Sequence, residues 1–361
     1  MSIKDKLLKN SKSKFTSTLN DSKIFGKSDM IQTSVPVLNL AFSGEFDGGF
    51  IPGFTMIAGP SKHFKTGFSL VMAKAYLDKY DDAVILFYDT EFGSPEEYFE
   101  TFDIDFDRVI HTPITNIEEL KFDIMSQLEQ IDRSDHVFIL IDSIGNIASK
   151  KEVEDAMNEK SVADMSRAKQ LKSLFRMVTP HLKLKDIPLV AINHTYKEQS
   201  LFPKDIVSGG TGAYYSADTI WIIGRQQEKD SKGISGYNFV INVEKSRFVR
   251  EKSKIPVSIR WEDGIQKWSG LLDLALETGF IRKVKPGKYA ACDSDIEYAE
   301  KKLLKTDPIW EGLLMNTEFT SACSQKYKVG YGKMFNENRS LQDSGETTGI
   351  DSSVETTGVD G

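Results

Sequence analysis

The chain has 361 residues, of which 40% are hydrophobic and 27% are charged, a composition typical of a globular protein with one large domain or two modest ones. Its net charge of −7 excludes a globally basic chain, so binding to nucleic acid would require a local basic surface. The two scattered cysteines, Cys292 and Cys323, exclude a disulfide framework and a zinc site and indicate reduced thiols in a cytosolic protein.

Residues 1–30 predict a basic amphipathic helical segment that precedes the core. Its first 14 residues contain lysines at positions 4, 6, 9, 12 and 14 and one acid, Asp5. One hypothesis is that this segment mediates oligomerisation by docking on a neighbouring subunit through Ile24 and Phe25. The alternative is a helix folded onto its own domain. The segment lacks the apolar core and cleavage site of a signal peptide, and no run in the chain approaches the roughly 18 to 20 apolar residues of a membrane helix.

Apolar runs of strand length alternate with helical periods over residues 31–272. The predicted strands cover 54–58, 83–88, 137–141, 187–192, 219–223, 239–243 and 256–261. The predicted helices cover 66–76, 117–131 and 161–179, whereas the charged stretch 151–160 predicts a mobile loop. Strands that alternate with helices favour an α/β fold, in which helices flank a mostly parallel twisted sheet.

The pattern weakens after Gly270, where we expect a short helix at 271–276 within a small C-terminal region, 273–335. Residues 336–361 contain almost no large apolar side chains, and Arg339 is their only basic residue. Such a segment cannot bury enough apolar surface to fold, so it predicts a disordered acidic tail. The tail could compete for a basic groove, or it could have no role.

A phosphate-binding loop is predicted between the first strand of the core and the helix after it. The sequence there is Gly59-Pro-Ser-Lys-His-Phe-Lys65-Thr66, and the candidate phosphate-binding residues are Gly59, Pro60, Ser61, Lys62, His63, Phe64, Lys65 and Thr66. Consecutive backbone N–H groups and a helix N-terminus would hold the phosphates, Lys65 would reach the β- and γ-phosphates, and Thr66 would bind Mg²⁺. The usual second glycine is replaced by Phe64, which lacks glycine's freedom at positive φ. The alternative is an ordinary lysine-containing loop.

Polar side chains end the other predicted strands, where parallel sheets bind their ligands. Asp142 is a candidate Mg²⁺ ligand, although aspartates also cap helices and form turns. Glu91 could orient and polarise the water that attacks a γ-phosphate, and its alternative is a surface ion pair. His194, after Asn193, could sense the γ-phosphate and pass its presence to the next loop, or it could simply be packed or solvated.

Two loops that leave the same edge of the sheet contain basic side chains and could follow a nucleic-acid backbone. The candidate DNA-binding residues are Lys150, Lys151, Arg167, Lys197 and Lys204, with Gly209 and Gly210 in the glycine-rich run 209–212. Lys169 lies in the same cluster. Solvated charge is the alternative, because Glu152, Glu154, Asp155 and Glu159 oppose the lysines.

Four motifs together resemble one family. The phosphate loop, Phe-Tyr-Asp-Thr-Glu91-Phe-Gly93, Ile-Asp142-Ser-Ile-Gly-Asn-Ile-Ala-Ser-Lys150-Lys151 and Ile-Asn-His194-Thr-Tyr are similar to motifs of the UvsX-type recombinases of T-even-like bacteriophages. These are phage relatives of the bacterial RecA recombinases, and the phage group shares the departure at Phe64. The resemblance extends from about residue 4 to residue 279, and it is weak beyond that point.

The resemblance implies a RecA-like P-loop ATPase that polymerises on single-stranded DNA and exchanges strands with a homologous duplex, using ATP and Mg²⁺. Glu91 resembles the family's catalytic glutamate, and Tyr98 matches the tyrosine that stacks on adenine. His194 replaces the glutamine that senses the γ-phosphate in bacterial RecA. Lys245 and Arg247 match the cations that reach the ATP of a neighbouring subunit, although a strand end with salt bridges is the alternative for this pair.

The resemblance also assigns residues 150–160 and 197–212 to the two DNA-binding loops. The implied partners are single- and double-stranded DNA, other copies of the chain in a helical filament, a phage single-strand-binding protein and a recombination mediator, with no membrane. The implied location is the cytoplasm of an infected bacterium. Two alternatives are a ring helicase with a RecA fold and a non-catalytic, nucleotide-gated DNA-binding paralogue.

Overall fold

The computed structural model describes residues 1–22, 29–93, 96–158, 166–198, 205–230 and 233–330. Residues Met1–Val329 form one compact unit and Gly330–Gly361 form a second. The predicted acidic tail and the predicted anchors Ile24 and Phe25 lie outside the described residues. The domain boundaries predicted within the first unit stay a prediction.

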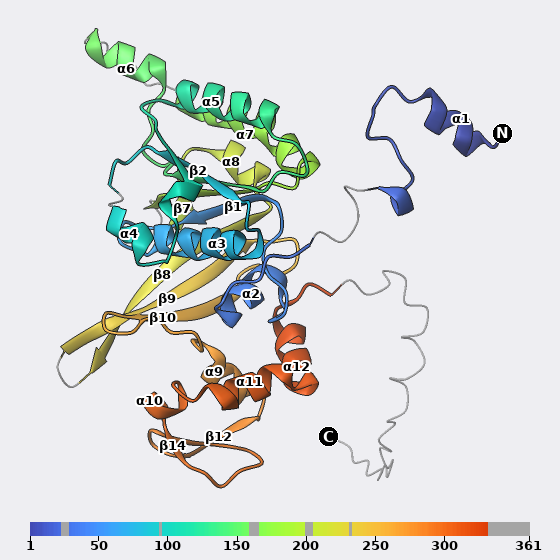
Figure 1. The fold of residues 1–361 in the computed structure, drawn as a ribbon. Helices are drawn as coiled ribbons and strands as arrows, with labels where there is room; N and C mark the ends of the chain where they lie inside the picture. Colours follow the sequence, from blue (N-terminus) through green and yellow to red (C-terminus); the bar gives the residue numbers. More distant parts are fainter. Residues whose placement is uncertain (23–28, 94–95, 159–165, 199–204, 231–232, 331–361) are drawn as a thin grey trace, which may run out of the picture. The chain divides into compact units, whose positions relative to one another are not determined.

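The described part of the first unit contains a nine-stranded sheet in the order β11-β10-β9-β8-β1-β5-β4-β2-β3 (Figure 1). Its strands are β1 (Gly53–Ala58), β2 (Val84–Asp89), β3 (Val109–Pro113), β4 (Val137–Asp142), β5 (Pro188–Asn193), β8 (Thr219–Asp230), β9 (Gly233–Lys245), β10 (Lys254–Arg260) and β11 (Gly264–Ile265). Strands β8 to β3 pair in parallel, and β8 to β11 pair antiparallel. The predicted α/β class is therefore confirmed, but β8 and β9 are much longer than expected.

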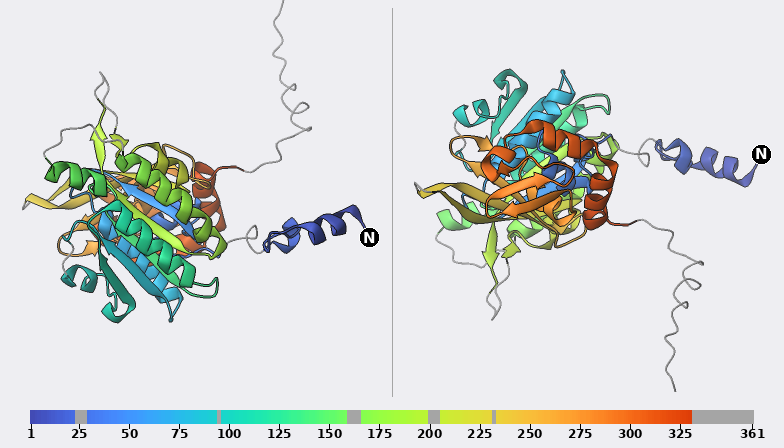
Figure 2. Two further views of the ribbon diagram at one scale, coloured as in Figure 1. Left: turned by 90° about the horizontal axis from the view of Figure 1, so that it is seen from above. Right: turned by 90° about the horizontal axis from the view of Figure 1, so that it is seen from below.

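Helices cover both faces of this sheet. They are α2 (Pro36–Ser43), α3 (Lys65–Lys79), α4 (Glu96–Glu100), α5 (Ile117–Gln130), α7 (Ser166–Leu184) and α8 (Thr211–Ser216), with short 3₁₀ turns at Leu19–Asp21 and Phe106–Arg108. Successive strand residues point to opposite faces, so Met56 joins the core under α5 and α7 whereas Ile57 joins the core under α2 and α3. Figure 2 shows α5 and α7, in green, across the strands in the view from above.

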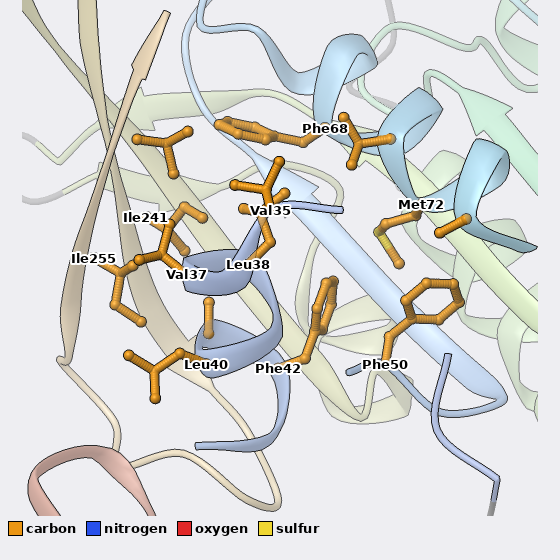
Figure 3. Close-up of a cluster of buried hydrophobic side chains, with 14 of the residues drawn as sticks. Val35, Val37, Leu38, Leu40, Phe42, Phe50, Phe68, Met72, Ile241 and Ile255 are labelled. Carbon is orange, nitrogen blue, oxygen red and sulfur yellow. The ribbon is translucent and has the colours of Figure 1, made fainter. Parts of the chain in front are cut away.

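Helix α2 packs against α3 and the antiparallel strands, and all eight of its residues are buried (Figure 3). Pro36 begins the helix, where its missing N–H costs nothing, and Gly44 ends it in the left-handed conformation with φ of 74°. Phe42 lies 4.1 Å from the Trp221 ring of β8, measured between ring centroids. This packing connects the parallel and antiparallel halves of the sheet.

Two local predictions need correction. The predicted loop at 151–160 is wrong over its described part, because α6 (Lys150–Met157) begins there with a capping box between Ser149 and Glu152. A short antiparallel ribbon, β6 (Thr195–Lys197) and β7 (Asp205–Val207), was not predicted. The first residues of the helix predicted at 161–179 lie outside the described residues, and the described helix α7 extends beyond the predicted end.

The C-terminal part of the first unit shares a core with α2. Its elements are α9 (Leu271–Glu277), β12 (Ile281–Lys285), β13 (Lys288–Ala291), β14 (Tyr298–Ala299), α10 (Glu300–Leu303), α11 (Asp307–Met315) and α12 (Thr317–Tyr327). Phe319 of α12 stacks on Phe46 at a centroid distance of 5.8 Å, and Lys328 forms an ion pair with Glu45. The short helix predicted at 271–276 is confirmed by α9.

Helix α1 (Ile3–Asn10) begins with a capping box formed by Ser2 and Asp5, and none of its residues is buried. Among the described residues, no helix has both the length and the apolar character needed to cross a membrane. Cys292 is exposed and Cys323 is buried, and both are free thiols.

Candidate active site

The parallel register brings four strand ends to one edge of the sheet. Ala58 at the end of β1 pairs with Asn193 at the end of β5, and Asp89 at the end of β2 pairs with Asp142 at the end of β4. The side chains and loops that follow these residues therefore converge, as expected for ligand sites on parallel sheets.

The phosphate loop passes very close to β8. Gly59 has φ of 156°, and a Cβ atom at this position would lie 3.0 Å from the backbone oxygen of Ile223. A side chain at residue 59 would therefore force the two backbones apart. The first glycine of the motif is required by this close approach, in addition to any later contact with a ligand.

Phe64 adopts the left-handed conformation that glycine usually supplies, with φ of 56°. This costs a non-glycine residue about 1–2 kcal/mol. The ring packs against Phe68 and Phe239 at centroid distances of 5.4 and 5.6 Å. A Cβ at position 67 would lie only 2.3 Å from that ring. Glycine is therefore needed at 67, one helical turn after the position where the usual motif has it.

Lys65, Thr66 and Asp142 form the polar floor of the site. The Lys65 Nζ donates to the Pro60 carbonyl at 2.9 Å, and burial lowers the pKa of this lysine. The Thr66 hydroxyl donates to Asp142 Oδ2 at 2.7 Å. Burial raises the pKa of Asp142 to about 6, although the Thr66 hydrogen bond opposes that shift.

Glu91 is held by two side chains from neighbouring loops. Its Oε1 accepts from Ser143 Oγ at 2.5 Å and lies 2.9 Å from His194 Nε2. These contacts, the one with His194 foremost, lower the pKa of Glu91 to about 2. In this arrangement the carboxylate is stabilised in its charged form and is a weak base.

Two residues that support Glu91 were not assigned roles from the sequence. Asp89 Oδ1 accepts from the backbone N–H groups of Glu91 and Phe92 at 3.1 and 2.8 Å, which fixes the turn after β2. Ser143 directly follows Asp142, and its own backbone N–H donates to Thr90 at 2.8 Å. The sequence feature that could have indicated a role for both residues is their position at strand ends, next to candidate site residues.

Asn193 connects the site to the residues after the β6–β7 ribbon. It is fully buried, and its Oδ1 accepts from the Ser208 hydroxyl at 2.8 Å while its Nδ2 donates to the Ser208 carbonyl at 3.0 Å. Ser208 also donates its backbone N–H to the His194 carbonyl at 2.9 Å. A movement of the segment that contains Ser208 would therefore reach His194 directly.

A cavity of about 370 Å³ is lined by most of the predicted nucleotide residues. Its lining residues are Ser61, Lys62, His63, Phe64, Lys65, Thr66, Glu91, Gly93, Tyr98, Asp142, Ile192 and His194. Burial and the nearby Asp142 raise the pKa of Tyr98 to about 12, so its hydroxyl is neutral at pH 7. The structure thus brings the phosphate loop, the two carboxylates, Tyr98 and His194 together.

The lining residues fit a nucleoside triphosphate with Mg²⁺. Hydroxyl and carboxylate oxygens, as in Thr66 and Asp142, are the ligands that Mg²⁺ prefers. The Lys65 ammonium is held against a backbone carbonyl, a contact that a phosphate oxygen can replace with a stronger, charge-assisted one. Mg²⁺ held by these two residues would act as a Lewis acid and would stabilise the negative charge of the phosphates.

Lys245 and Arg247 lie outside this cavity. Arg247 donates to Asp218 Oδ1 at 2.7 Å, and Asp218 also accepts from the N–H of Phe54 at the beginning of β1. The beginning of β1 is the end that points away from the phosphate loop. Lys245 donates to the carbonyls of Tyr214 and Tyr215 at 3.0 and 3.1 Å.

The predicted DNA-binding residues are more dispersed. Lys150 and Lys151 begin the exposed helix α6, and Lys197 forms an ion pair with Asp205 at 2.8 Å. Gly209 and Gly210 both have positive φ, of 86° and 78°, directly before α8. Lys204 lies outside the described residues.

Arg167 has backbone partners within the chain. Its guanidinium donates to the carbonyls of Ile144 and Ile147, each at 2.9 Å, and to that of Gly145. Burial lowers its pKa. These contacts hold the segment after β4 in place, and direct contact between Arg167 and DNA stays a prediction.

The fold defines the class: an α/β protein with a RecA-like core, whose cavity is lined by a candidate phosphate-binding loop. The chain is 47% identical to the recombination and repair protein of Enterobacteria phage T4 over 337 residues, which are 91% of this chain and 86% of the phage protein. The chain therefore belongs to the family of this phage protein, and the resemblance to UvsX-type recombinases is confirmed.

The comparisons also found one family model and more distant relatives. The family model described as Bacteriophage T4, Recombination and repair protein, C-terminal domain, matches residues 268–323. RecA of Streptomyces coelicolor is 24% identical over 202 residues, 55% of this chain and 53% of that protein. The crystal structure of the RadB recombinase aligns with a TM-score of 0.46 at 19% identity, over 62% of this chain and 94% of that one.

The closeness of the Phe64 ring to Gly67 predicts that an alanine substitution in helix α3 has an unusual effect on stability. Gly→Ala within a helix normally stabilises a protein by roughly 0.5–1 kcal/mol. Here the added methyl group meets the Phe64 ring, so we expect Gly67→Ala to lower the free energy of unfolding by about 1–3 kcal/mol. In a Phe64→Gly background, the same substitution should be neutral or stabilising. Urea unfolding of the four proteins measures the coupling, and an equal cost in both backgrounds would contradict it.

The lowered pKa of Glu91 predicts a pH dependence of stability. Because its folded pKa of about 2 lies below the ordinary 4.5, the contacts of the carboxylate stabilise the folded state above pH 4.5, and this stabilisation is lost as the pH falls toward 2. The melting temperature of wild type should therefore exceed that of Glu91→Gln, by a margin that shrinks below pH 4.5. Glu97 of α4 is exposed and gives the control Glu97→Gln, which removes a carboxylate but leaves the contacts of Glu91 intact. A margin that grows on acidification would refute the assignment.

Proposed function

We propose that the chain is a DNA-dependent ATPase and homologous recombination protein. It would form filaments on single-stranded DNA and catalyse homologous pairing and strand exchange in phage recombination, repair and recombination-dependent replication. One observation carries this proposal: the hydrogen bond between Glu91 and His194 joins the carboxylate of the nucleotide cavity to the residue that precedes the β6–β7 ribbon. The membership of the T4 recombination and repair protein family supports it.

In the proposed site, ATP lies on the phosphate loop, with Lys65 on the β- and γ-phosphates and Mg²⁺ at Thr66 and Asp142. Tyr98 would stack on adenine. The attacking water would be oriented by Glu91, and His194 would detect the γ-phosphate. The cavity that these residues line supports the assignment.

The same contacts suggest how DNA would stimulate hydrolysis. Glu91 Oε1 accepts from Ser143 and lies 2.9 Å from His194, so this oxygen is engaged and weakly basic in the described state. DNA that binds at the β6–β7 ribbon would move His194 through Asn193 and Ser208. Loss of the His194 contact would raise the pKa of Glu91 and free an oxygen for water.

DNA would be contacted by the two loops at the same edge of the sheet. Lys150 and Lys151 on α6 and Lys197 and Lys204 around the ribbon would neutralise phosphates, and Gly209 and Gly210 would let the backbone approach closely. Arg167 would act with this group through the segment that it holds after β4. The exposed position of α6 supports a role in binding.

Self-association would complete the ATP site. Lys245 and Arg247 lie away from the cavity of their own chain, so we propose that they meet the γ-phosphate bound to the neighbouring subunit. Repetition of such a head-to-tail contact produces a filament. The N-terminal segment, whose helix α1 buries none of its residues, would dock on the neighbour and strengthen that contact.

The proposed setting is the cytoplasm of an infected bacterium. There the filament would work with a phage single-strand-binding protein and a recombination mediator on single- and double-stranded DNA. The similarity to the T4 protein supports this setting.

ATP hydrolysis with and without single-stranded DNA tests the proposal. We expect stimulation that fades as salt rises, because phosphate contacts weaken with salt. Lys65→Ala should abolish nucleotide binding, and Glu91→Gln should lower kcat by about 10²–10⁴ while it retains ATP and DNA. Wild-type turnover in Glu91→Gln would refute its role. Hydrolysis indifferent to DNA would contradict the coupling, and no hydrolysis would favour a non-catalytic paralogue. Stable rings without filaments in electron micrographs would favour a ring helicase.

Mixing two inactive variants tests the shared ATP site. A filament of Lys65→Ala alone lacks the phosphate-loop lysine, and one of Lys245→Ala/Arg247→Ala lacks the proposed neighbour cations. In a random equal mixture, roughly a quarter of the interfaces combine an intact phosphate loop with intact cations. DNA-stimulated activity should therefore reappear on mixing. A mixture as inactive as its parts would show that these cations do not act across an interface.

A further inference from the structure

An arginine of β8 reaches the phosphate loop from outside. Ile222 of β8 pairs with Ala58, the last residue of β1, so β8 continues alongside the loop that follows β1. Three residues further on, Arg225 Nη1 donates to the Lys62 carbonyl at 2.9 Å. The Arg225 guanidinium also lies 4.7 Å from the centroid of the Tyr237 ring of β9, which limits its orientations.

The carbonyl that Arg225 holds belongs to a backbone position that needs support. Lys62 has φ of 60°, a backbone conformation that residues other than glycine rarely adopt unless their surroundings impose it. Phe64, two residues later, has φ of 56° and is held by Phe239 of β9. The hairpin of β8 and β9 therefore supports both left-handed residues of the loop.

The direction of the Lys62 carbonyl sets the direction of the next N–H group. A trans peptide unit is planar, so a carbonyl fixed on Arg225 turns the N–H of His63 the opposite way. His63 lines the nucleotide cavity. Arg225 itself does not line this cavity, so it can act on a ligand there through the loop that it holds.

We propose that Arg225 is a positioning residue for the phosphate loop, which keeps the Lys62–His63 peptide oriented for phosphate before the nucleotide arrives. This inference rests on the proposed binding of a nucleoside polyphosphate in the cavity. Without Arg225, the loop must be ordered when the nucleotide binds, and that ordering weakens affinity. The chemistry of the bound phosphate is unchanged, so nucleotide affinity changes and the maximal turnover does not.

The experiment measures the affinity of the full-length chain for Mg·ADP by titration calorimetry. The variants are Arg225→Ala, Lys62→Gly and the combination of both. Arg250→Ala is the matched control, because Arg250 also donates from an exposed position to a backbone carbonyl, that of Lys328 at 3.1 Å. Melting temperatures of all variants show whether each one folds.

We expect Arg225→Ala to weaken Mg·ADP binding by about three- to tenfold, the range for one lost hydrogen bond, with kcat unchanged at saturating ATP. Lys62→Gly removes a side chain that lines the cavity, so it serves as its own reference, and in that background Arg225→Ala should weaken binding by less than threefold, because glycine adopts positive φ without support. Arg250→Ala should bind as wild type does. If Arg225→Ala is not folded, Arg225→Lys, which keeps the charge but loses the planar stack on Tyr237, replaces it in both comparisons.

An effect below threefold in Arg225→Ala would overturn the inference. An effect of Arg225→Ala that is equally large in the wild-type and Lys62→Gly backgrounds would overturn it too, because Arg225 would then not act through the strained backbone at Lys62. Wild type that fails to bind Mg·ADP would instead contradict the proposed function. The two failures are therefore separable in one set of titrations.

Discussion

The register of the parallel strands is the constraint on which the candidate site depends. Pairing of Ala58 with Asn193 and of Asp89 with Asp142 places the residues after β1, β2, β4 and β5 at one edge. A one-residue slip of β4 would turn Asp142 to the other face of the sheet and separate it from Thr66. The apolar faces under α3 and under α5 and α7 prevent that slip, because each alternate strand residue is committed to one of two cores. The chemistry at the edge is thus fixed by hydrophobic packing away from it.

Polar contacts then connect that edge to the loops. Asp89 fixes the turn that contains Glu91, Ser143 and His194 hold its carboxylate, and Asn193 ties His194 to Ser208. Each contact is an ordinary hydrogen bond, but the chain of contacts is continuous from the nucleotide cavity to the β6–β7 ribbon. A continuous chain lets a change at one end alter the pKa at the other, which neither an isolated carboxylate nor an isolated loop could do.

Much of the fold follows from local pattern. Buried parallel strands read as apolar runs, so the strands that end at Tyr88 or Asp89 and at Ile141 or Asp142 were predictable to within a residue. The helix α6 was predictable in principle, since Ser149 and Glu152 form a capping box, but its charge suggested a loop. The length of β8 and β9 was not predictable, because those strands stabilise each other through pairs far apart in sequence.

The candidate site likewise contains residues that the sequence predicts and residues whose role only the structure shows. The phosphate loop, Asp142 and Glu91 carry motif signals, whereas Arg167 shows the limit of reasoning from charge, since its buried partners are backbone carbonyls. Phe64 marks a second limit. The sequence shows that a glycine is missing, but only the structure shows that Gly67 provides space for the ring and that Phe239 supports it. A loop whose left-handed residues are held from outside needs fewer glycines, but it depends more on the strands beside it. In this chain, the antiparallel half of the sheet therefore supports the candidate phosphate site directly.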